Sequence, residues 1–240
     1  MAEALQVKRA RSWASGRERA ARALQWYQTE YGVAIPPAPA KIIDELLTDY
    51  LGASLSYDPL PQDTFAKVCW RDGQPVVTVN ARISLMANVK DHLGVEAVAK
   101  CHELVHIQDD GPMAESAPQG LFPGFEAPTV MTCFRSVSDS RDEASRQCEI
   151  QAEEIGRAFA VSWSHLERSG AFQALLRFAG RPAPRGEAWR LVYESAADLG
   201  ISATSLVRQL TLEGCIALVK EDGKPQLYIQ PGLLDRVRTA

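Results

Sequence analysis

The sequence predicts an α+β protein, in which a small antiparallel sheet lies among helices and is followed by a C-terminal helix pair with a hairpin. Three observations indicate this class. Several segments between 8 and 213 show helical apolar spacing, short alternating β-favouring runs lie between 54 and 80, and two more such runs lie near the carboxyl end. The length of 240 residues, with 46% hydrophobic and 23% charged residues, suits one large domain or two small ones.

Composition excludes several classes of protein. The formal charge of -4, from 26 Lys and Arg against 30 Asp and Glu, excludes a strongly basic nucleic-acid coat. Five cysteines without a CxxC pair argue against a disulfide framework and a zinc ribbon. No apolar run approaches the roughly 18 residues of a membrane span, and the basic amino terminus has no apolar segment behind it. We therefore expect a cytoplasmic protein with no membrane span and no signal peptide.

The spacing of apolar residues, and the Pro and Gly residues that end each pattern, predict the first elements of the chain. Residues 8–31 have a helical pattern, with Trp13, Leu24 and Tyr27 on one stripe, and the prolines at 35–40 end it. KIIDELLTDYLG predicts a second helix that Gly52 caps. SLSYD, FAKVCW and PVVTVN then predict strands of an antiparallel sheet.

The middle of the chain predicts two helices separated by a loop. Apolar spacing from about 92 to 109 indicates a largely buried helix, which we expect to break at Gly111 and Pro112. Seven Gly or Pro in the eighteen residues 111–128 predict a loop, and the long segment 111–140 is a candidate cover for a site. Another helix is expected from about 140 to 167.

After the link GRPAPRG at 180–186, the pattern predicts helices at 187–198 and 202–213 with a turn at Gly200, then a hairpin of CIALV and QLYI. This order is typical of a winged helix-turn-helix. The second helix offers only Arg208 as a strong phosphate contact, so a structural or substrate-docking role is favoured over DNA binding. The predicted units are an N-terminal helix (1–34), a main domain (35–180) and this helical pair with its hairpin (187–240).

The chemistry concentrates at His102, Glu103 and His106, in a stretch from 96 to 154 that carries four basic and twelve acidic residues, a charge of -8. On a helix, residues i and i+4 lie on one face, so His102 and His106 can bind one metal ion. Zinc is the natural occupant, because it binds imidazole and lowers the pKa of a bound water to about 7. Glu103 lies at the edge of that face and can accept the proton of such a water. The sequence therefore predicts two ligands and a general base.

A catalytic zinc needs a third protein ligand. The metzincin spacing is excluded, because Pro112 stands where its third ligand would fall. EIQAEEIGRAFA at 149–160 predicts a helix on which Glu149 and Glu153 share a face, so either can supply a carboxylate. Asp109 is a further candidate, as an acceptor that orients a ligand His or as a helix cap.

HELVH after an apolar helix stretch, PVVTVN before it and ExxGRxFA after it together resemble the ImmA/IrrE family of bacterial and phage zinc metallopeptidases. The resemblance covers roughly 35–215 and implies a zincin-like fold, a zinc ion and regulated cleavage of a helix-turn-helix transcriptional repressor, for example under stress. It also implies Glu153 as third ligand, with Glu149 as the alternative. The chain departs from the pattern at Gly156 and Arg157, where the family has Ala and Asn.

The predicted function is therefore a zinc metallopeptidase in which His102, His106 and Glu153 bind the metal and Glu103 is the base. The alternative is a DNA-binding or partner-binding regulator with a structural or sensory zinc site. In a latent enzyme, Cys133 would close the fourth zinc position. His165 is expected to be a surface or core residue.

Overall fold

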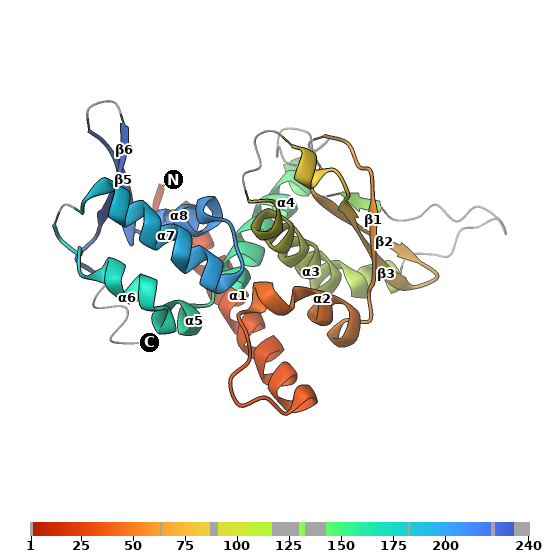
Figure 1. Cartoon of the computed structure of the whole chain (residues 1–240). Coiled ribbons are helices and arrows are strands. Elements are labelled where there is room, and N and C mark those ends of the chain that lie inside the picture. The colour runs from red at the N-terminus through yellow and green to blue at the C-terminus, as the bar shows by residue number, and fades with distance from the viewer. Residues whose placement is uncertain are drawn as a thin grey trace.

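The computed structural model describes residues 2–62, 64–86, 91–116, 130–132, 143–181, 183–221 and 224–232. Figure 1 shows two groups of elements, with the first helix between them: α2, α3, α4 and a sheet on one side, α5 to α8 and a hairpin on the other. The class is α+β, as predicted. The helices are α1 (Ala2–Tyr31), α2 (Ile43–Glu45), α3 (His92–Ser116), α4 (Glu143–Ala160), α5 (Trp163–Arg168), α6 (Gly170–Leu176), α7 (Arg185–Leu199) and α8 (Ala203–Leu212).

The sheet is mixed, so the prediction of an antiparallel sheet is wrong in part. Its strands, β1 (Ser54–Asp58), β2 (Ala66–Arg71), β3 (Gln74–Asn80) and β4 (Val130–Thr132), lie in the order β1-β3-β2-β4. β2 and β3 form the expected hairpin, but β1 pairs with β3 in parallel. The reason is the strand order, in which β3 lies between β1 and β2. The parallel neighbours β1 and β3 need a crossover connection, and β2 with its flanking loops supplies it. Alternating apolar residues do not reveal which strands are neighbours.

Asn80 holds this crossover in place. Its buried side chain accepts hydrogen bonds from the backbone N–H groups of Leu60 and Arg82, at 3.2 and 3.0 Å, and donates one to the carbonyl of Thr64 at 2.7 Å. One amide thus satisfies several backbone groups of a loop that has no strand partners.

Two further expectations need correction. α3 continues to Ser116 and does not break at Gly111 and Pro112. A proline inside a helix removes the N–H bond to the residue four positions before it and its ring crowds that residue's carbonyl, which can kink a helix without ending it. The predicted second helix is irregular, because a 3₁₀ turn (Pro39–Ile42) leads into α2 and a π turn (Leu46–Tyr50) follows it.

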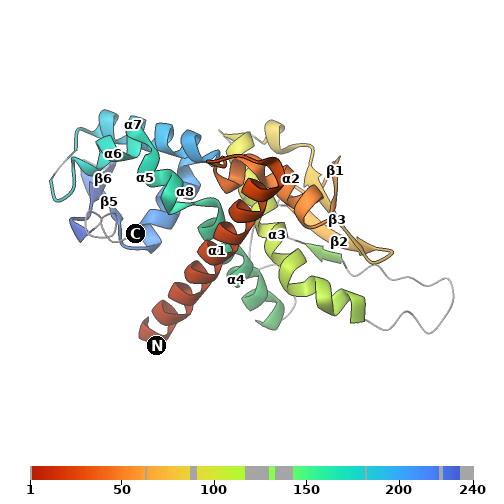
Figure 2. The same cartoon turned by 90° about the horizontal axis from the view of Figure 1, so that it is seen from below.

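The core lies between the sheet and α3 and continues through α1 and α4 into the C-terminal helices. Figure 2 shows α1 running diagonally past the junction of the two groups, alongside α4. Gly16 makes a close contact between α1 and α4 possible. A Cβ on Gly16 of α1 would lie 2.5 Å from the carbonyl oxygen of Ile155 in α4.

The C-terminal elements agree with prediction. α7 ends at Gly200, which adopts a left-handed conformation (φ 74°), and α8 follows. The hairpin consists of β5 (Ile216–Glu221) and β6 (Lys224–Ile229), which pair antiparallel. The turn between α7 and α8 lies against Gly94 of α3, where an added Cβ would collide with the backbone of Ile201 and Ser202. Within the described ranges, no helix has the length and apolarity that crossing a membrane requires.

Candidate metal centre

α3 brings His102, Glu103 and His106 into the interior. His102 is 6% exposed, His106 is 3% exposed and Glu103 is completely buried. The two imidazoles lie one helical turn apart, and their Nε2 atoms are 2.9 Å from each other. Both rings therefore present the same nitrogen to one point beside the helix, as the HExxH spacing predicts.

α4 supplies a carboxylate at the same point, and it comes from Glu149. Its Oε2 lies 3.2 Å from Nε2 of His102, and its Oε1 lies 3.5 Å from Nε2 of His106. Each carboxylate oxygen thus faces a different imidazole. Across the described part of the chain, these three residues form the one group of His, Cys, Asp or Glu side chains placed to share a metal ion.

The missing side chain of Gly156 lets α4 approach α3 this closely. A Cβ at Gly156 would lie 2.9 Å from Cα of His102 and 3.0 Å from the carbonyl oxygen of Cys101. Real Cβ atoms do not come that near to backbone atoms, so any side chain here would push the helices apart. Gly156 lies two turns from Glu149 on α4, and it therefore sets the distance between the carboxylate and the imidazoles.

The electrostatics of the site favour an ionised carboxylate. Burial alone would raise the pKa of Glu149, but hydrogen bonds from His102 and His106, and the charge of these imidazoles when they are protonated, outweigh it and lower the pKa to about 2. Glu149 is accordingly a carboxylate across the physiological pH range, which is the form that binds a metal ion.

The donor atoms lie close enough together to share one metal ion. Ligands at about 2.0–2.1 Å from a tetrahedral zinc lie about 3.3 Å from one another. The two imidazole nitrogens lie 2.9 Å apart, and each lies 3.2–3.5 Å from a different oxygen of Glu149. With one donor atom taken from each residue, the three donors lie within 4.8 Å of one another, a group that could hold one metal ion.

Glu153, the third ligand that the resemblance implied, does not join this group. Its carboxylate oxygen Oε1 accepts a hydrogen bond from Arg157 on its own helix and forms an ion pair with Arg208 of α8 at 2.8 Å. The two guanidiniums hold it one turn along α4, toward the C-terminal helices. In this arrangement the alternative, Glu149, and not Glu153, lies beside the two imidazoles.

Arg157 is a partner that sequence reasoning missed. It is only 3% exposed, and burial, opposed by the charge of Glu153, lowers its pKa to about 10. The signal in the sequence was the departure from the family pattern at this position. An arginine four residues after Glu153 is placed to form an ion pair with it on the helix, and the pair removes that carboxylate from the candidate ligands.

The remaining candidates lie elsewhere. Asp109 is exposed and accepts a hydrogen bond from Arg19 of α1 at 2.7 Å, so it joins α3 to α1 and is neither a helix cap nor an acceptor for a ligand His. His165 lies in the first turn of α5 and is half-buried. Cys133 and most of 111–140 lie outside the described residues.

Comparisons with known proteins add no relative: no family model, no curated protein and no solved structure matches the chain. Two His and a Glu in one helix, with a Glu on a neighbouring helix, form a buried cluster consistent with an HExxH-type site.

Proposed function

We propose that the protein is a zinc-dependent metallopeptidase with a zincin-like main domain. One observation carries the proposal: His102, His106 and Glu149 form a buried group that could hold one metal ion, and Glu103 lies beside His102 on the same buried helix. Three protein ligands leave a fourth position open, which distinguishes a catalytic zinc site from a structural one.

Each residue of the site has its own proposed role. His102, His106 and Glu149 would hold the ion, and their two nitrogens and one oxygen suit zinc. A zinc ion held there would lower the pKa of a bound water to about 7 and would polarise a carbonyl group. Glu103 accepts the proton of the attacking water and passes it to the leaving nitrogen of the peptide. Its full burial keeps its carboxylate out of bulk water.

The proposed substrate is a helix-turn-helix transcriptional repressor, cut at a specific site. This part of the proposal rests on the resemblance of HELVH and ExxGRxFA to the ImmA/IrrE family and on no contact within the chain. It can therefore fail while the peptidase proposal stands.

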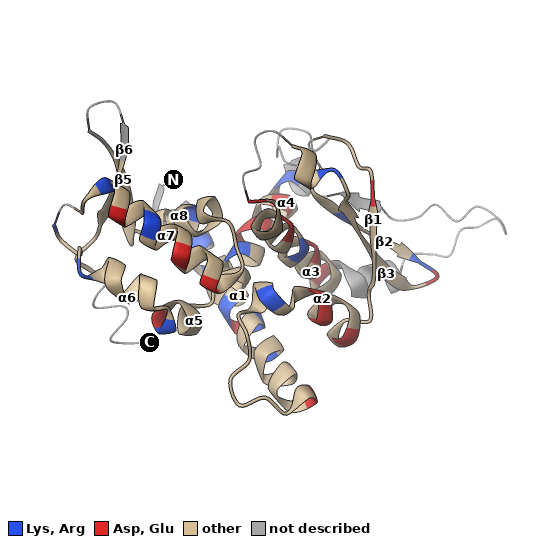
Figure 3. Ribbon diagram, viewed as in Figure 1, with Lys and Arg blue, Asp and Glu red and all other residues tan. Residues whose placement is uncertain are grey.

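The contacts of α8 favour a structural role for the helix pair over DNA reading, the alternative function. Arg208, the one strong phosphate contact that the sequence offered, pairs with Glu153 of α4. Figure 3 shows basic and acidic residues mixed along α7, and Arg190 there pairs with Glu194 at 2.6 Å. DNA binding needs a basic surface that is free to meet phosphates.

The test uses the full chain and its Glu103→Gln variant, with Glu154→Gln as the matched control. Glu154 is a carboxylate on α4 that pairs with Arg9 of α1 and lies outside the cluster. Each protein is co-expressed with the product of any adjacent repressor gene and separately incubated with a mixed peptide library. Zinc content is measured by mass spectrometry, and cleavage by the masses of the fragments.

We expect zinc in all three proteins and cleavage by the wild type and Glu154→Gln alone. Equal cleavage by Glu103→Gln would rule out Glu103 as the base. Bound zinc without cleavage of either substrate would contradict the peptidase proposal and favour a regulator. Cleavage of peptides but not of the repressor would contradict only the proposed substrate.

A further inference from the structure

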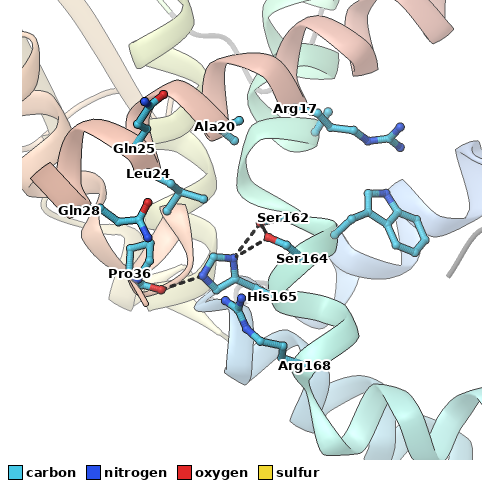
Figure 4. Close-up of a pocket in the computed structure, with 13 residues that line it drawn as sticks. Arg17, Ala20, Leu24, Gln25, Gln28, Pro36, Ser162, Ser164, His165 and Arg168 are labelled. Atoms are coloured by element: carbon cyan, nitrogen blue, oxygen red, sulfur yellow. Dashed lines mark hydrogen bonds between the residues drawn. The ribbon is translucent and has the colours of Figure 1, made fainter. Parts of the chain in front are cut away.

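A cavity of about 340 Å³ lies between α1, the segment that follows it and the start of α5, away from the metal cluster. Figure 4 shows its walls: Leu24 and Ala20 come from α1, His165 and Ser164 from α5, and Pro36 closes one end. Pockets for small molecules measure about 300–1,000 Å³, so this cavity suits a small ligand and is too small for a folded partner.

Hydrogen bonds on both sides keep the cavity open. His165 bridges it at the base, because Nε2 lies 2.9 Å from the carbonyl oxygen of Pro36 and Nδ1 lies 2.8 Å from the hydroxyl of Ser162. A carbonyl only accepts, so Nε2 carries the proton and Nδ1 accepts from Ser162. On the other side, Gln28 donates to the carbonyl of Ala34 at 2.9 Å. The segment after α1 is thus fastened to both helices, and the cavity is preformed.

The charge of the lining is positive. Two of its residues are Arg17 and Arg168, and no lining residue is acidic. Arg17 is partly neutralised, since it pairs with Glu213 and lies over the ring of Trp163 at 5.9 Å. Arg168 is exposed, and no carboxylate within the described ranges forms an ion pair with it. Its guanidinium lies beside His165 (Figure 4) and has donors to offer an anion.

The rest of the lining is mainly apolar and suits a hydrophobic body. Leu24, Ala20, Ala21, Ala158 and Trp163 supply most of this wall. We propose that the cavity binds a small organic anion, an aromatic or alicyclic molecule with one carboxylate, sulfonate or phosphate group. The apolar body contacts the α1 wall, and the acidic group pairs with Arg168. The proposal does not depend on the metal site or on peptidase activity.

The probe is 8-anilinonaphthalene-1-sulfonate, an organic anion with a flat apolar body. N-phenyl-1-naphthylamine has the same rings without the sulfonate and is the matched neutral probe. Binding of each to the full chain is followed by fluorescence and calorimetry. The variants are Arg168→Gln, which removes the charge, and Ala21→Trp, which fills the cavity from an exposed position on α1. Arg185→Gln is the control, an exposed arginine outside the lining.

We expect one sulfonate probe to bind per wild-type chain. Arg168→Gln should weaken it about tenfold, the loss typical of a hydrogen bond to a charged group, and leave the neutral probe nearly unchanged. Ala21→Trp should weaken both probes, and Arg185→Gln neither. No saturable binding to the wild type, or equal affinity in Arg168→Gln and Arg185→Gln, would overturn the proposal. Unfolding curves recorded without dye check that each variant is folded. If Ala21→Trp does not fold, the binding measurements on Arg168→Gln test the proposal by themselves.

Discussion

At the scale of single residues, two glutamates one helical turn apart have different roles. Glu149 faces two imidazoles, and Glu153 faces two guanidiniums. Both are acidic residues on the same helix, so their surroundings alone separate a candidate ligand from a structural ion-pair partner. This difference gives a sharp test of the ligand assignment.

Glu149→Gln should lower the affinity for zinc by at least about 100-fold, because a neutral amide replaces an anionic ligand. Glu153→Gln removes the same charge one turn away and should leave zinc affinity within a few-fold of the wild type. Competition with a chromogenic chelator measures both constants. Loss of zinc in Glu153→Gln with retention in Glu149→Gln would reverse the assignment.

The lowered pKa of Glu149 also predicts a pH dependence for the metal-free protein. Hydrogen bonds and charge from His102 and His106 overcome burial and bring the pKa to about 2, below the roughly 4.3 of an unfolded glutamate. The carboxylate therefore stabilises the fold fully above about pH 5, and this contribution is lost as pH falls from there through about 2.

Urea unfolding of the metal-free wild type and Glu149→Gln, measured between pH 6 and 2, checks this. The difference in free energy of unfolding should be largest at the upper end of that range and should disappear at the lower end. A difference that grows as pH falls would show that the pKa of Glu149 is raised.

At the scale of elements, the contact between α3 and α4 makes the site. α4 contacts the backbone of His102 in α3 through Gly156, and it contacts Gly16 of α1. Because neither glycine has a side chain, the three helices can lie close together. Close backbone contact of this kind leaves little freedom to the side chains that it aligns.

Gly156→Ala should therefore destabilise the protein by about 1–3 kcal/mol through overpacking, and it should weaken zinc binding as Glu149 moves from the imidazoles. Gly186→Ala is the matched control, because a Cβ at Gly186 of α7 meets no atom within 4 Å. Denaturant unfolding and chelator competition measure both effects. Equal stability of the two variants would show that α4 can shift without cost.

At the scale of the whole molecule, α1 joins the two groups of elements. It packs on α4 through Gly16, and its next residue, Arg17, pairs with Glu213 at the end of α8. The Glu213 side chain is 1% exposed and also accepts a hydrogen bond from Gln209 at 2.6 Å. A buried carboxylate of this kind depends on its cation.

Arg17→Gln should lower the free energy of unfolding by about 1–3 kcal/mol, since it removes the charge that compensates a buried carboxylate. Arg11→Gln, an exposed arginine on the same helix, should change it by less than about 0.5 kcal/mol. Denaturant unfolding of both variants is the measurement. The same free energy in the two variants would contradict a joining role for Arg17.

The sequence by itself determined the α+β class, the buried helix with His102, Glu103 and His106, and the C-terminal helix pair with its hairpin, because these follow from local periodicity, spacing and turn residues. The boundaries at 1–34, 35–180 and 187–240 stay a prediction. Tertiary structure alone decided that β1 lies parallel to β3 and that Glu149, rather than Glu153, meets the imidazoles. Strand neighbours and the registration of one helix on another depend on contacts between distant segments, such as Gly156 against His102, and no local pattern encodes them.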